Sequence, residues 1–402
     1  MSRLAVAVVV TRLQAGAGGV ALRGALAVDP EGYDVTIIAG GTDGTADADG
    51  SGDQLLDHAA AAGLRVVRVP GLVSPISPRR DTRALRLLTD HLAGVGYDVV
   101  HTHSAKAGAL GRLAAERAGT PRVVHTFHGF PFHEFQSRGR RAGYVAIERY
   151  LGRRTDVFLA VGGAVAAEAV RRGIAAPDRV RVINPAISWP ASPARPADRA
   201  TARRRLAIPV GCSVVGTVGR VDYQKAPESF VDAVAALDRP DVYAVWIGDG
   251  PLRRDMERRA DRRGLRDRFR CVGHRDDVPG LLPGLDVFVM ASRYEGLPCA
   301  VAEAMTAGLP VVATAVNAVP DVVLPGETGL LASPQRPQQL ATAIRYMLDE
   351  PAEAARMAAA GQRLIGDRFT ADALGAVLDA AYQTGPSRPP HPRGYVPLAR
   401  PA

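Results

Sequence analysis

Short apolar runs rich in valine and isoleucine recur along this 402-residue chain, and helix-like stretches separate them. The first half contains LAVAVVV, DVTIIA, LRVVRV, DVVHT, RVVHTF, VFLAV and RVRVI, and the second half contains SVVGTV, VYAVWI, FRCV, DVFVMA and PVVAT. Nearly continuous hydrophobicity indicates strands that are buried on both faces, as in parallel sheets covered by helices. The alternation predicts an α/β protein with two doubly wound, Rossmann-like parallel-sheet domains facing across a cleft.

Proline-rich segments mark the expected domain boundaries. The stretch SWPASPARPADRA lacks apolar periodicity and predicts a linker over residues 188–206, between domains at 1–187 and 207–367. We expect a helix over 368–384 that packs back toward the first domain, and a disordered proline- and arginine-rich tail over 385–402. An acidic, mobile loop is expected from Gly41 to Gln54.

The formal net charge of +9 suits polyanionic partners: phosphorylated metabolites, nucleic acid or an anionic membrane face. Nucleic acid is disfavoured because no recognised binding motif accompanies the charge. No apolar run approaches the roughly 18 residues of a spanning helix, and no signal peptide is evident. Three cysteines without CxxC spacing argue against a disulfide framework or a zinc site. These features predict a cytoplasmic protein.

Two cations follow the strand SVVGTV. Arg220 comes directly after Gly219, and Lys225 lies five residues further on, ahead of a helix expected from about Pro227. An arginine fork and a lysine point charge near a helix start can clamp a diphosphate, and a solvated charge pair is the alternative. Lysine otherwise occurs only at Lys106 among the 50 basic residues, which favours a functional role for Lys225.

Two glutamates follow the strand DVFVMA at a spacing of eight residues. Glu295 falls in the loop and Glu303 lies about a turn and a half into the next helix. Carboxylates can accept hydrogen bonds from the vicinal hydroxyls of a ribose or a hexose. The amides of Gly296 and Leu297 would face the phosphates between two such sugars. Surface glutamates at a helix start are the alternative.

A glycine-rich turn follows the first strand. Gly16, Gly18 and Gly19 leave a helix N-terminus open to close approach by an anion. A dinucleotide fingerprint would require an acidic residue at the end of the second strand, and DVTIIAGG ends in glycines. The turn therefore favours phosphate contact over NAD binding, with a plain tight turn as the alternative.

Together these motifs resemble the retaining nucleotide-sugar glycosyltransferases of the GT-B fold, in glycosyltransferase family 4. The likeness covers about residues 99–384 and is carried by GTVGRVDYQKAPESF, VGHRDDVPGLLPGLDVFVMASRYEGLPCAVAEAM and DVVHTHSAKAGALGRLAAERAGTPRVVHTFHGFPFHE. It implies that the first domain binds the acceptor and the second binds the donor. Ala226 departs from the family pattern, in which glycine is common, and the segment around Asn317 lacks a glycine pair.

The resemblance implies a role for each donor-site residue. Glu303 is similar to the family glutamate on the ribose hydroxyls, and Glu295 to the one on the transferred sugar. Arg220 and Lys225 match the diphosphate clamp, and the backbone around His274 would meet the nucleobase. Gly18 and Gly19 would approach the donor, with His128 near the transferred sugar. The acceptor candidates lie on two loops that mix cations with aromatic faces: His103, Lys106, Phe130 and His133.

The implied reaction is retaining transfer of a hexosyl or N-acetylhexosaminyl group from a UDP-type sugar to a sugar hydroxyl, in bacterial polysaccharide or lipid-linked glycan assembly. We expect His128, Arg220, Lys225 and Glu295 to be catalytic, with no cofactor and no divalent metal, because cationic side chains neutralise the leaving group. Three alternatives stay open: tailoring of a small-molecule natural product, a sugar-nucleotide epimerase or oxidoreductase of the same architecture, and an idle binding module. Two arginine clusters are candidates for membrane contact: Arg138, Arg140, Arg141 and residues 203–205.

Overall fold

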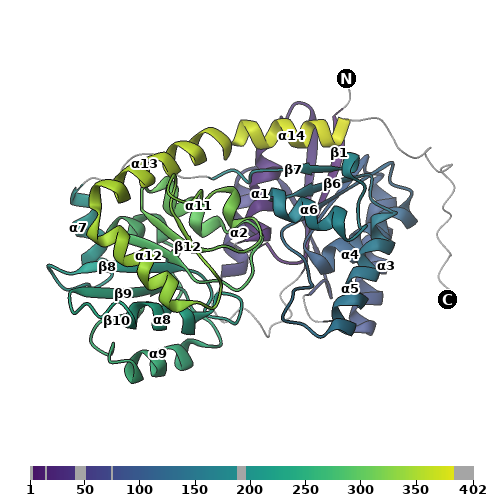
Figure 1. The fold of residues 1–402 in the computed structure, drawn as a ribbon. Coiled ribbons are helices and arrows are strands. Elements are labelled where there is room, and N and C mark those ends of the chain that lie inside the picture. The colour runs from purple at the N-terminus through teal and green to yellow at the C-terminus, as the bar shows by residue number, and fades with distance from the viewer. Residues whose placement is uncertain (1–2, 14–15, 41–50, 74–75, 188–195, 384–402) are drawn as a thin grey trace.

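The computed structural model describes residues 3–13, 16–40, 51–73, 76–187 and 196–383. These residues form two parallel sheets, one in each half of the chain (Figure 1). The strands of the first sheet are β1 (Leu4–Val10), β2 (Tyr33–Gly40), β3 (Arg65–Val69), β4 (Val99–His103), β5 (Arg122–Phe127), β6 (Val157–Ala160) and β7 (Val180–Val182). Those of the second are β8 (Ser213–Val218), β9 (Val242–Ile247), β10 (Phe269–Cys271), β11 (Val287–Met290), β12 (Val311–Thr314) and β13 (Leu330–Ala332).

Helices connect the strands and cover both sheets. In the first half they are α1 (Ala17–Ala27), α2 (Ser51–Ala61), α3 (Pro78–Val95), α4 (Ala105–Ala118), α5 (Arg138–Gly152) and α6 (Gly163–Arg171). The remaining helices are α7 (Pro196–Arg205), α8 (Pro227–Ala235), α9 (Arg253–Arg262), α10 (Val278–Leu281), α11 (Cys299–Thr306), α12 (Pro337–Asp349), α13 (Pro351–Arg368) and α14 (Ala371–Gln383). None of the helices described is both long and apolar enough to cross a membrane.

The strand orders confirm the predicted doubly wound domains. The first sheet runs β3-β2-β1-β4-β5-β6-β7 and the second β10-β9-β8-β11-β12-β13, and both reverse direction beside their first strand. Successive residues of β1 face different cores: Val8 packs on the α1 side, whereas Val9 packs with α3 and α4. Because both faces are covered, the strand must be apolar at every position, which explains its continuous hydrophobic run.

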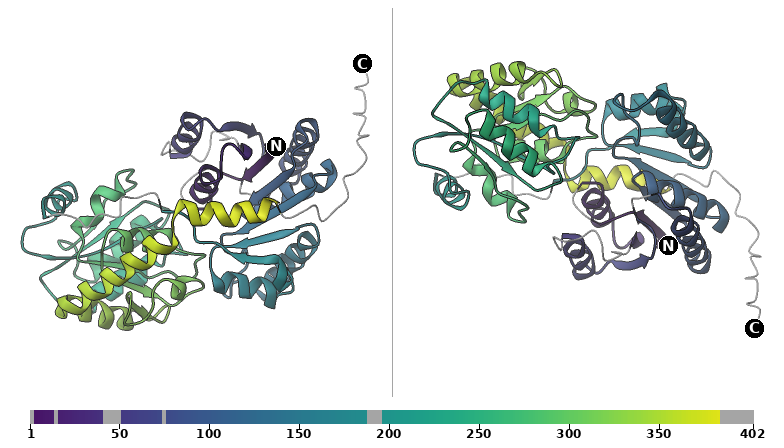
Figure 2. Two further views of the ribbon diagram at one scale, coloured as in Figure 1. Left: turned by 90° about the horizontal axis from the view of Figure 1, so that it is seen from above. Right: turned by 90° about the horizontal axis from the view of Figure 1, so that it is seen from below.

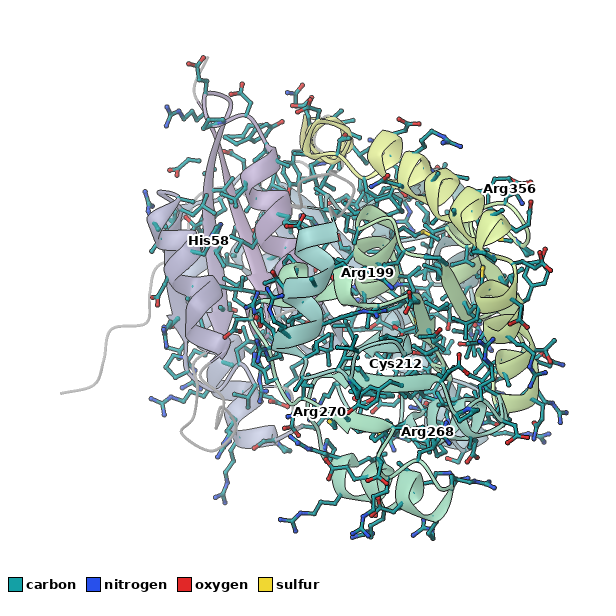
Figure 3. All side chains as sticks on the ribbon, turned by 90° about the vertical axis from the view of Figure 1, so that its left-hand side faces the viewer. His58, Arg199, Cys212, Arg268, Arg270 and Arg356 are labelled. Carbon is teal, nitrogen blue, oxygen red and sulfur yellow. The ribbon has the colours of Figure 1, made fainter. Side chains whose placement is uncertain are left out.

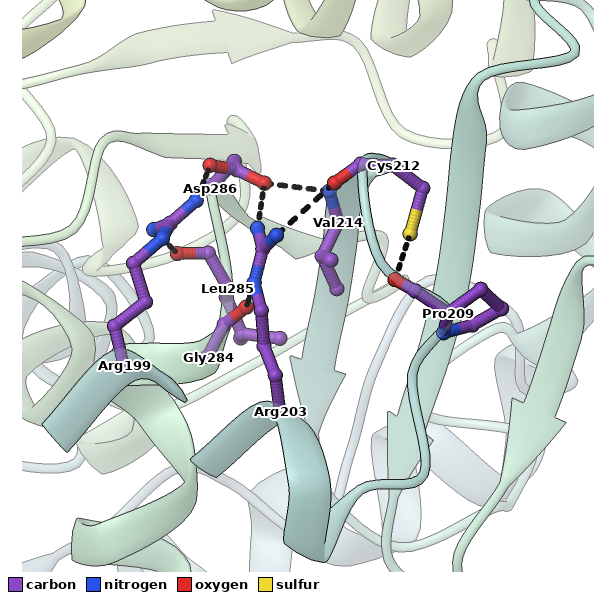
Figure 4. Close-up of polar contacts among 8 residues, drawn as sticks. All are labelled: Arg199, Arg203, Pro209, Cys212, Val214, Gly284, Leu285 and Asp286. Atoms are coloured by element: carbon purple, nitrogen blue, oxygen red, sulfur yellow. Dashed lines mark hydrogen bonds and ion pairs between the residues drawn. The ribbon is translucent and has the colours of Figure 1, made fainter. Parts of the chain in front are cut away.

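Part of the expected linker is helical and belongs with the second domain. Residues 188–195 lie outside the described residues, and α7 follows directly. Two α7 arginines, Arg199 and Arg203, bind the carboxylate of Asp286, which comes just before β11 (Figure 4). Asp286 also accepts a hydrogen bond from the backbone N–H of Val214 at 2.6 Å. The partly buried carboxylate of Asp286 thus fixes α7 against the second sheet.

The irregular acidic segment is shorter than expected. The sequence predicts a loop through Gln54, but α2 already begins at Ser51, so the boundary was wrong by four residues. The sequence that suggested a loop therefore continues into the first turn of this helix. Residues 41–50 and the tail at 384–402 lie outside the described residues.

Helix α14 returns the chain from the second domain to the first, as Figure 2 shows. Its Tyr382 hydroxyl lies 2.7 Å from Nδ1 of His101 in β4, and its Asp379 accepts a 2.6 Å hydrogen bond from the Tyr33 hydroxyl in β2. The backbone carbonyl of Ala381 accepts a bond of 2.6 Å from Arg122. The last described helix is therefore part of the first domain's packing.

Several surface arginines of the second domain have partners within that domain. Figure 3 shows Arg356 on α13, Arg268 just before the edge strand β10, and Arg270 within that strand. Arg356 binds Glu353 at 2.8 Å, and Arg268 donates to the carbonyl of Arg239 at 2.6 Å. The exposed Arg356–Glu353 pair adds little stability, and it neutralises part of the positive charge from which polyanionic partners were expected.

Candidate active site

The loops that follow the strands of both sheets meet between the two domains. A Cβ atom on Gly296, after β11, would lie only 1.8 Å from the carbonyl oxygen of His128, after β5. The ring of His133 stacks on Tyr294 with centroids 4.4 Å apart. Since ligands of open parallel sheets bind at the carboxyl ends of strands, this junction is the candidate active site. Only glycine fits at position 296.

The carboxylate of Glu295 accepts hydrogen bonds from three side chains of the site. Its Oε1 accepts hydrogen bonds from Lys225 Nζ and from Ser292 Oγ, both at 2.6 Å, and its Oε2 accepts one from Gln224 at 3.1 Å. The residue is only 8 % exposed, and a buried carboxylate requires such donors. The structure therefore brings Lys225 and Glu295 together, although the sequence assigned them to different parts of a donor.

Asn317 holds the loop that carries Glu295. Its side-chain oxygen accepts a 2.9 Å hydrogen bond from the Glu295 backbone N–H. Asn317 itself has a φ of 45°, in the left-handed region that asparagine tolerates better than most residues. At the position where the family pattern has a glycine pair, this chain therefore has an asparagine whose side chain binds the Glu295 backbone.

The two cations of the predicted clamp are placed differently. The methylene chain of Lys225 packs on Gly219, where an added Cβ would lie 3.2 Å from Lys225 Cε. Arg220 has a side chain that is 70 % exposed, with Nε 4.0 Å from Asp222. Ala226 has a φ of 50°, in the left-handed region, which costs a residue other than glycine about 1–2 kcal/mol. A glycine at this position would remove that cost. Lys225 is preoriented, whereas Arg220 extends into solvent.

Glu303 faces a cation that the sequence interpretation missed. Burial raises the pKa of Glu303, and the charges of Arg23 and Lys225 oppose that shift. Arg23 lies on α1 of the first domain, with Nη2 3.9 Å from Sγ of Cys299, at the start of α11. The available signal was an arginine in the middle of AGGVALRGALA, a helix that is otherwise largely buried.

His128 is partly buried and lies at the end of a chain of imidazoles whose other members are buried. Its Nε2 lies 2.9 Å from Nδ1 of His103, and the His103 ring lies against His101 with centroids 4.2 Å apart. Burial, followed by the charge of Arg23, lowers the pKa of His128 to about 4. Burial also lowers the pKa of His103. Both rings are therefore neutral at pH 7, so only one nitrogen of each carries a proton.

The unpartnered nitrogen of His103 fixes the direction of this hydrogen bond. His103 Nε2 is buried and has no hydrogen-bond partner within the described structure. A buried N–H without an acceptor is rarer than an unpaired acceptor. His103 therefore carries its proton on Nδ1 and donates to His128 Nε2, which leaves the His128 proton on Nδ1. His128 is then a hydrogen-bond donor at the nitrogen that does not face His103.

The four predicted acceptor residues each occupy a different environment. His103 is 3 % exposed and contacts His128, and Phe130 stacks on Phe132 with centroids 4.7 Å apart. His133 stacks across the domain junction on Tyr294. Lys106 binds Asp81 at 2.6 Å. Acceptor binding by these four residues stays a prediction.

Lys106 lies on the wall of a first-domain pocket of about 580 Å³. The pocket opens beside the glycine turn, at the carboxyl ends of β1 and β4. Its lining is mainly apolar, with the Lys106–Asp81 ion pair and the Glu148 carboxylate among its polar groups: Val10, Thr11, Arg12, Ala17, Gly18, Ile76, Asp81, Ser104, Ala105, Lys106, Ala109, Leu110, Pro131, Tyr144, Ile147 and Glu148. A space of this size and composition suits a ligand with an apolar part.

Two family comparisons cover most of the chain. Residues 15–188 match Glycosyltransferase Family 4, and residues 198–364 match Glycosyl transferases group 1. A galactosyltransferase of Escherichia coli, named UDP-Gal:alpha-D-GlcNAc-diphosphoundecaprenol alpha-1,3-galactosyltransferase, is 31% identical over 259 residues, which are 63% of this chain and 67% of that protein. The chain belongs to glycosyltransferase family 4.

Further relatives of this glycosyltransferase differ in what they act on. The 2-deoxystreptamine glucosyltransferase of Streptomyces kanamyceticus is 32% identical over 269 residues, 64% of this chain and 69% of that protein. Among solved structures, Anabaena HepE in complex with UDP and glucose has a TM-score of 0.80 at 20% identity, covering 94% of this chain and 99% of HepE. The lipopolysaccharide glycosyltransferase WaaG has a TM-score of 0.73 at 18% identity, covering 94% of this chain and 100% of WaaG. These likenesses confirm the predicted GT-B fold.

The remaining donor-site predictions for this glycosyltransferase concern backbone positions. His274 is exposed and hydrogen-bonds Asp276 at 3.1 Å, directly after an isolated antiparallel bridge between Gly248 and Gly273 that lies beyond the ends of β9 and β10. A Cβ on Gly18 would lie 2.6 Å from the carbonyl of Arg12, so this turn requires glycine.

Within the described ranges, no group of three or more His, Cys, Asp or Glu side chains could hold a metal ion.

Proposed function

We propose that this glycosyltransferase transfers a hexosyl or N-acetylhexosaminyl group from a UDP-type nucleotide sugar to a sugar hydroxyl, with retention of configuration. The observation that carries the proposal is the preorganised Lys225–Glu295 pair, 2.6 Å apart, at the junction where Gly296 abuts His128. It supplies a cation for a leaving diphosphate and a carboxylate for sugar hydroxyls within one rigid unit. The relative that uses UDP-Gal and the HepE complex with UDP support the choice of donor.

In the proposed reaction the bond between the anomeric carbon and the diphosphate oxygen breaks as negative charge develops on the diphosphate. Lys225 and Arg220 stabilise that charge, and the amides of Gly296 and Leu297 face it. The acceptor oxygen attacks the same face and forms the new bond, while its proton moves to the departing phosphate oxygen. Glu295 holds hydroxyls of the transferred sugar, and His128 donates a hydrogen bond from Nδ1 to position a sugar hydroxyl. Glu303 accepts hydrogen bonds from the ribose.

The first domain supplies the acceptor site in this proposal. The largely apolar pocket beside Lys106 favours a lipid-linked sugar, and the E. coli relative is named for such an acceptor. Arg138, Arg140 and Arg141, at the start of α5 near this pocket, would face an anionic membrane surface at the inner leaflet. The relative named for 2-deoxystreptamine supports a second candidate, in which a small natural product is the acceptor. Assays with both acceptor classes separate the two.

Transfer is further proposed to require no divalent metal, because Lys225 and Arg220 provide the positive charge. Product formation in the presence of EDTA tests this directly. The anomeric configuration of the product, read by NMR, tests retention. Sugar isomerisation without transfer would instead favour an epimerase.

The decisive experiment combines nucleotide-sugar binding with turnover. A donor at one hundred times its Kd stabilises the folded protein by about 2.7 kcal/mol, which raises its melting temperature measurably. Lys225→Met and Glu303→Gln should each lower kcat/KM by about 10²–10³-fold, the effect of removing one preorganised charge or hydrogen bond from a transition state. The exposed Glu31→Gln and Arg117→Met are the matched controls. Full activity in either site variant would contradict the proposal.

A further inference from the structure

Arg23 reaches from the first domain to the second. An added Cβ on Gly19 would lie 3.2 Å from Arg23 Nη1, so the side chain folds back over the first turn of α1. Its Nη2 lies 3.9 Å from Sγ of Cys299, the first residue of α11. The guanidinium is therefore located between the N-termini of two helices, one from each domain. Helix N-termini carry partial positive charge and favour anions.

This guanidinium has no carboxylate or carbonyl partner in the described part of the chain. Its Nε is buried and unpaired, and the weak contact with Cys299 is its one hydrogen bond there. Two buried arginines of the first domain differ from Arg23 in having such a partner: Arg112 donates to Glu148 at 2.9 Å, although its Nη1 is also unpaired, and Arg122 donates to the carbonyl of Ala381. A buried donor without an acceptor costs about 1–3 kcal/mol, so a ligand that supplies acceptors would relieve that cost.

The surroundings of Arg23 indicate which part of a ligand would meet it. Its charge lowers the pKa of both His128 and Glu303, so both groups lie within electrostatic reach of it. Under the proposed function, His128 meets the transferred sugar and Glu303 meets the ribose. The group that joins those two sugars in a nucleotide sugar is the diphosphate, and oxygens of a phosphate match the fork of a guanidinium.

We propose that Arg23 binds the diphosphate of the donor from the first domain, opposite Lys225 and Arg220 of the second. This inference rests on the proposed function. It adds a third cation to the leaving-group site and makes the diphosphate contact both domains. A nucleoside without phosphates would contact only the second domain and would not depend on Arg23.

The test compares the affinities of UDP and uridine for the full chain. Arg23→Met should weaken UDP binding about 10–100-fold, the loss expected for a charge-assisted hydrogen bond, and change uridine binding less than twofold. Arg23→Lys keeps the charge without the fork and should give an intermediate loss. Arg117→Met, an exposed arginine at the far end of α4, is the matched control and should bind both ligands as the unmodified protein does.

Two results would overturn the inference. Equal weakening of UDP and uridine would mean that Arg23 only positions Glu303 or the domain junction, and unchanged UDP affinity would mean that it does not meet the diphosphate. Should Arg23→Met fold poorly by circular dichroism, Arg23→Lys replaces it in the comparison. The competition of inorganic pyrophosphate with UDP is then measured for Arg23→Lys and for the unmodified protein. Failure of the unmodified protein to bind UDP would contradict the proposed function itself, whereas binding that depends on Lys225 but not on Arg23 contradicts this inference alone.

Discussion

At the scale of single residues, His103 illustrates how one side chain determines the chemistry of another. It is buried, neutral and bonded to His128 through Nδ1, and its other nitrogen has no partner within the described residues. The consequence is a defined tautomer at His128, the residue that we place beside the transferred sugar. A neighbour that sets a tautomer acts as a positioning residue even without touching substrate.

Substitutions at His103 should separate positioning from packing. Asparagine places its amide nitrogen close to the Nδ1 position and preserves the hydrogen bond to His128, whereas leucine fills the space without a donor. We expect His103→Leu to lower kcat about tenfold or more with little change in KM, equivalent to at least ~1.4 kcal/mol, and His103→Asn to retain most of the activity. The measurement is steady-state kinetics with donor varied. Equal losses in both variants would assign His103 a purely structural role.

At the scale of elements, β4 and β5 place four histidines in the first domain's interior. His101 and His103 lie in β4, His125 lies in β5, and His128 follows it; burial is the largest cause of the lowered pKa of each. Hydroxyl groups accompany them: His101 contacts Tyr382 and Thr126, and His125 contacts Thr102. The two strands therefore hold neutral imidazoles in a network that includes a helix from the end of the described chain.

This network predicts that stability falls in mild acid. An unfolded histidine binds a proton near pH 6.5, but the pKa of folded His128 is about 4 and that of His101 about 3. Between pH 6.5 and the lower pKa values of the folded protein, the unfolded state binds more protons than the folded state. The free energy of unfolding is therefore highest above about pH 6.5 and falls as the pH drops below it. Urea denaturation from pH 7.5 to 4.5 should show this slope.

Substitution of one histidine identifies the source of the slope. His101→Gln cannot titrate, so its free energy of unfolding should vary less steeply with pH, whatever its value at pH 7.5. His58→Gln, at an exposed position of α2, is the control and should leave the slope unchanged. An identical slope in His101→Gln would show that His101 does not contribute to the acid sensitivity.

At the scale of the whole molecule, α13 and α14 connect the two domains along one side (Figures 1 and 2). Helix α14 packs on α1, and the contact is close: an added Cβ on Gly375 would lie 2.4 Å from the backbone carbonyl of Ala27. Its Tyr382 also ends the histidine network at His101. The position of the second domain relative to Arg23 and His128 thus depends on a helix far from the active site.

Gly375→Val should displace α14 and destabilise the protein. The clash involves a backbone atom that cannot rotate away, so we expect a loss of about 1–3 kcal/mol, as for an overpacked core, seen as a lower melting temperature. Gly366→Ala is the matched control, because an added Cβ there meets nothing within 4 Å and a helical alanine adds roughly 0.5–1 kcal/mol. An unchanged melting temperature in Gly375→Val would contradict the close packing of α14 on α1.

Local sequence was sufficient to predict the architecture, whereas the roles of the candidate-site residues stay predictions. Continuous apolar runs such as LAVAVVV follow from strands covered on both faces. The loops after β8 and β11 contain Lys225 and Glu295, and Glu303 lies in the helix that follows, because open parallel sheets bind ligands at the carboxyl ends of their strands. The extent of the acidic loop was wrong, since polar residues at Ser51–Gln54 suit a helix start as well as a turn. Such residues carry no periodic signal that distinguishes the two.

The sequence by itself determined two parallel sheets, the glycine turn and the charged loops, because strand and helix periodicity is a property of a few neighbouring residues. Only the tertiary structure decided that Lys225 binds Glu295, that His103 orients His128, and that Arg23 meets Cys299 from 276 positions away along the chain. Contacts over such separations depend on how two complete domains pack, and no local pattern of side chains specifies that geometry.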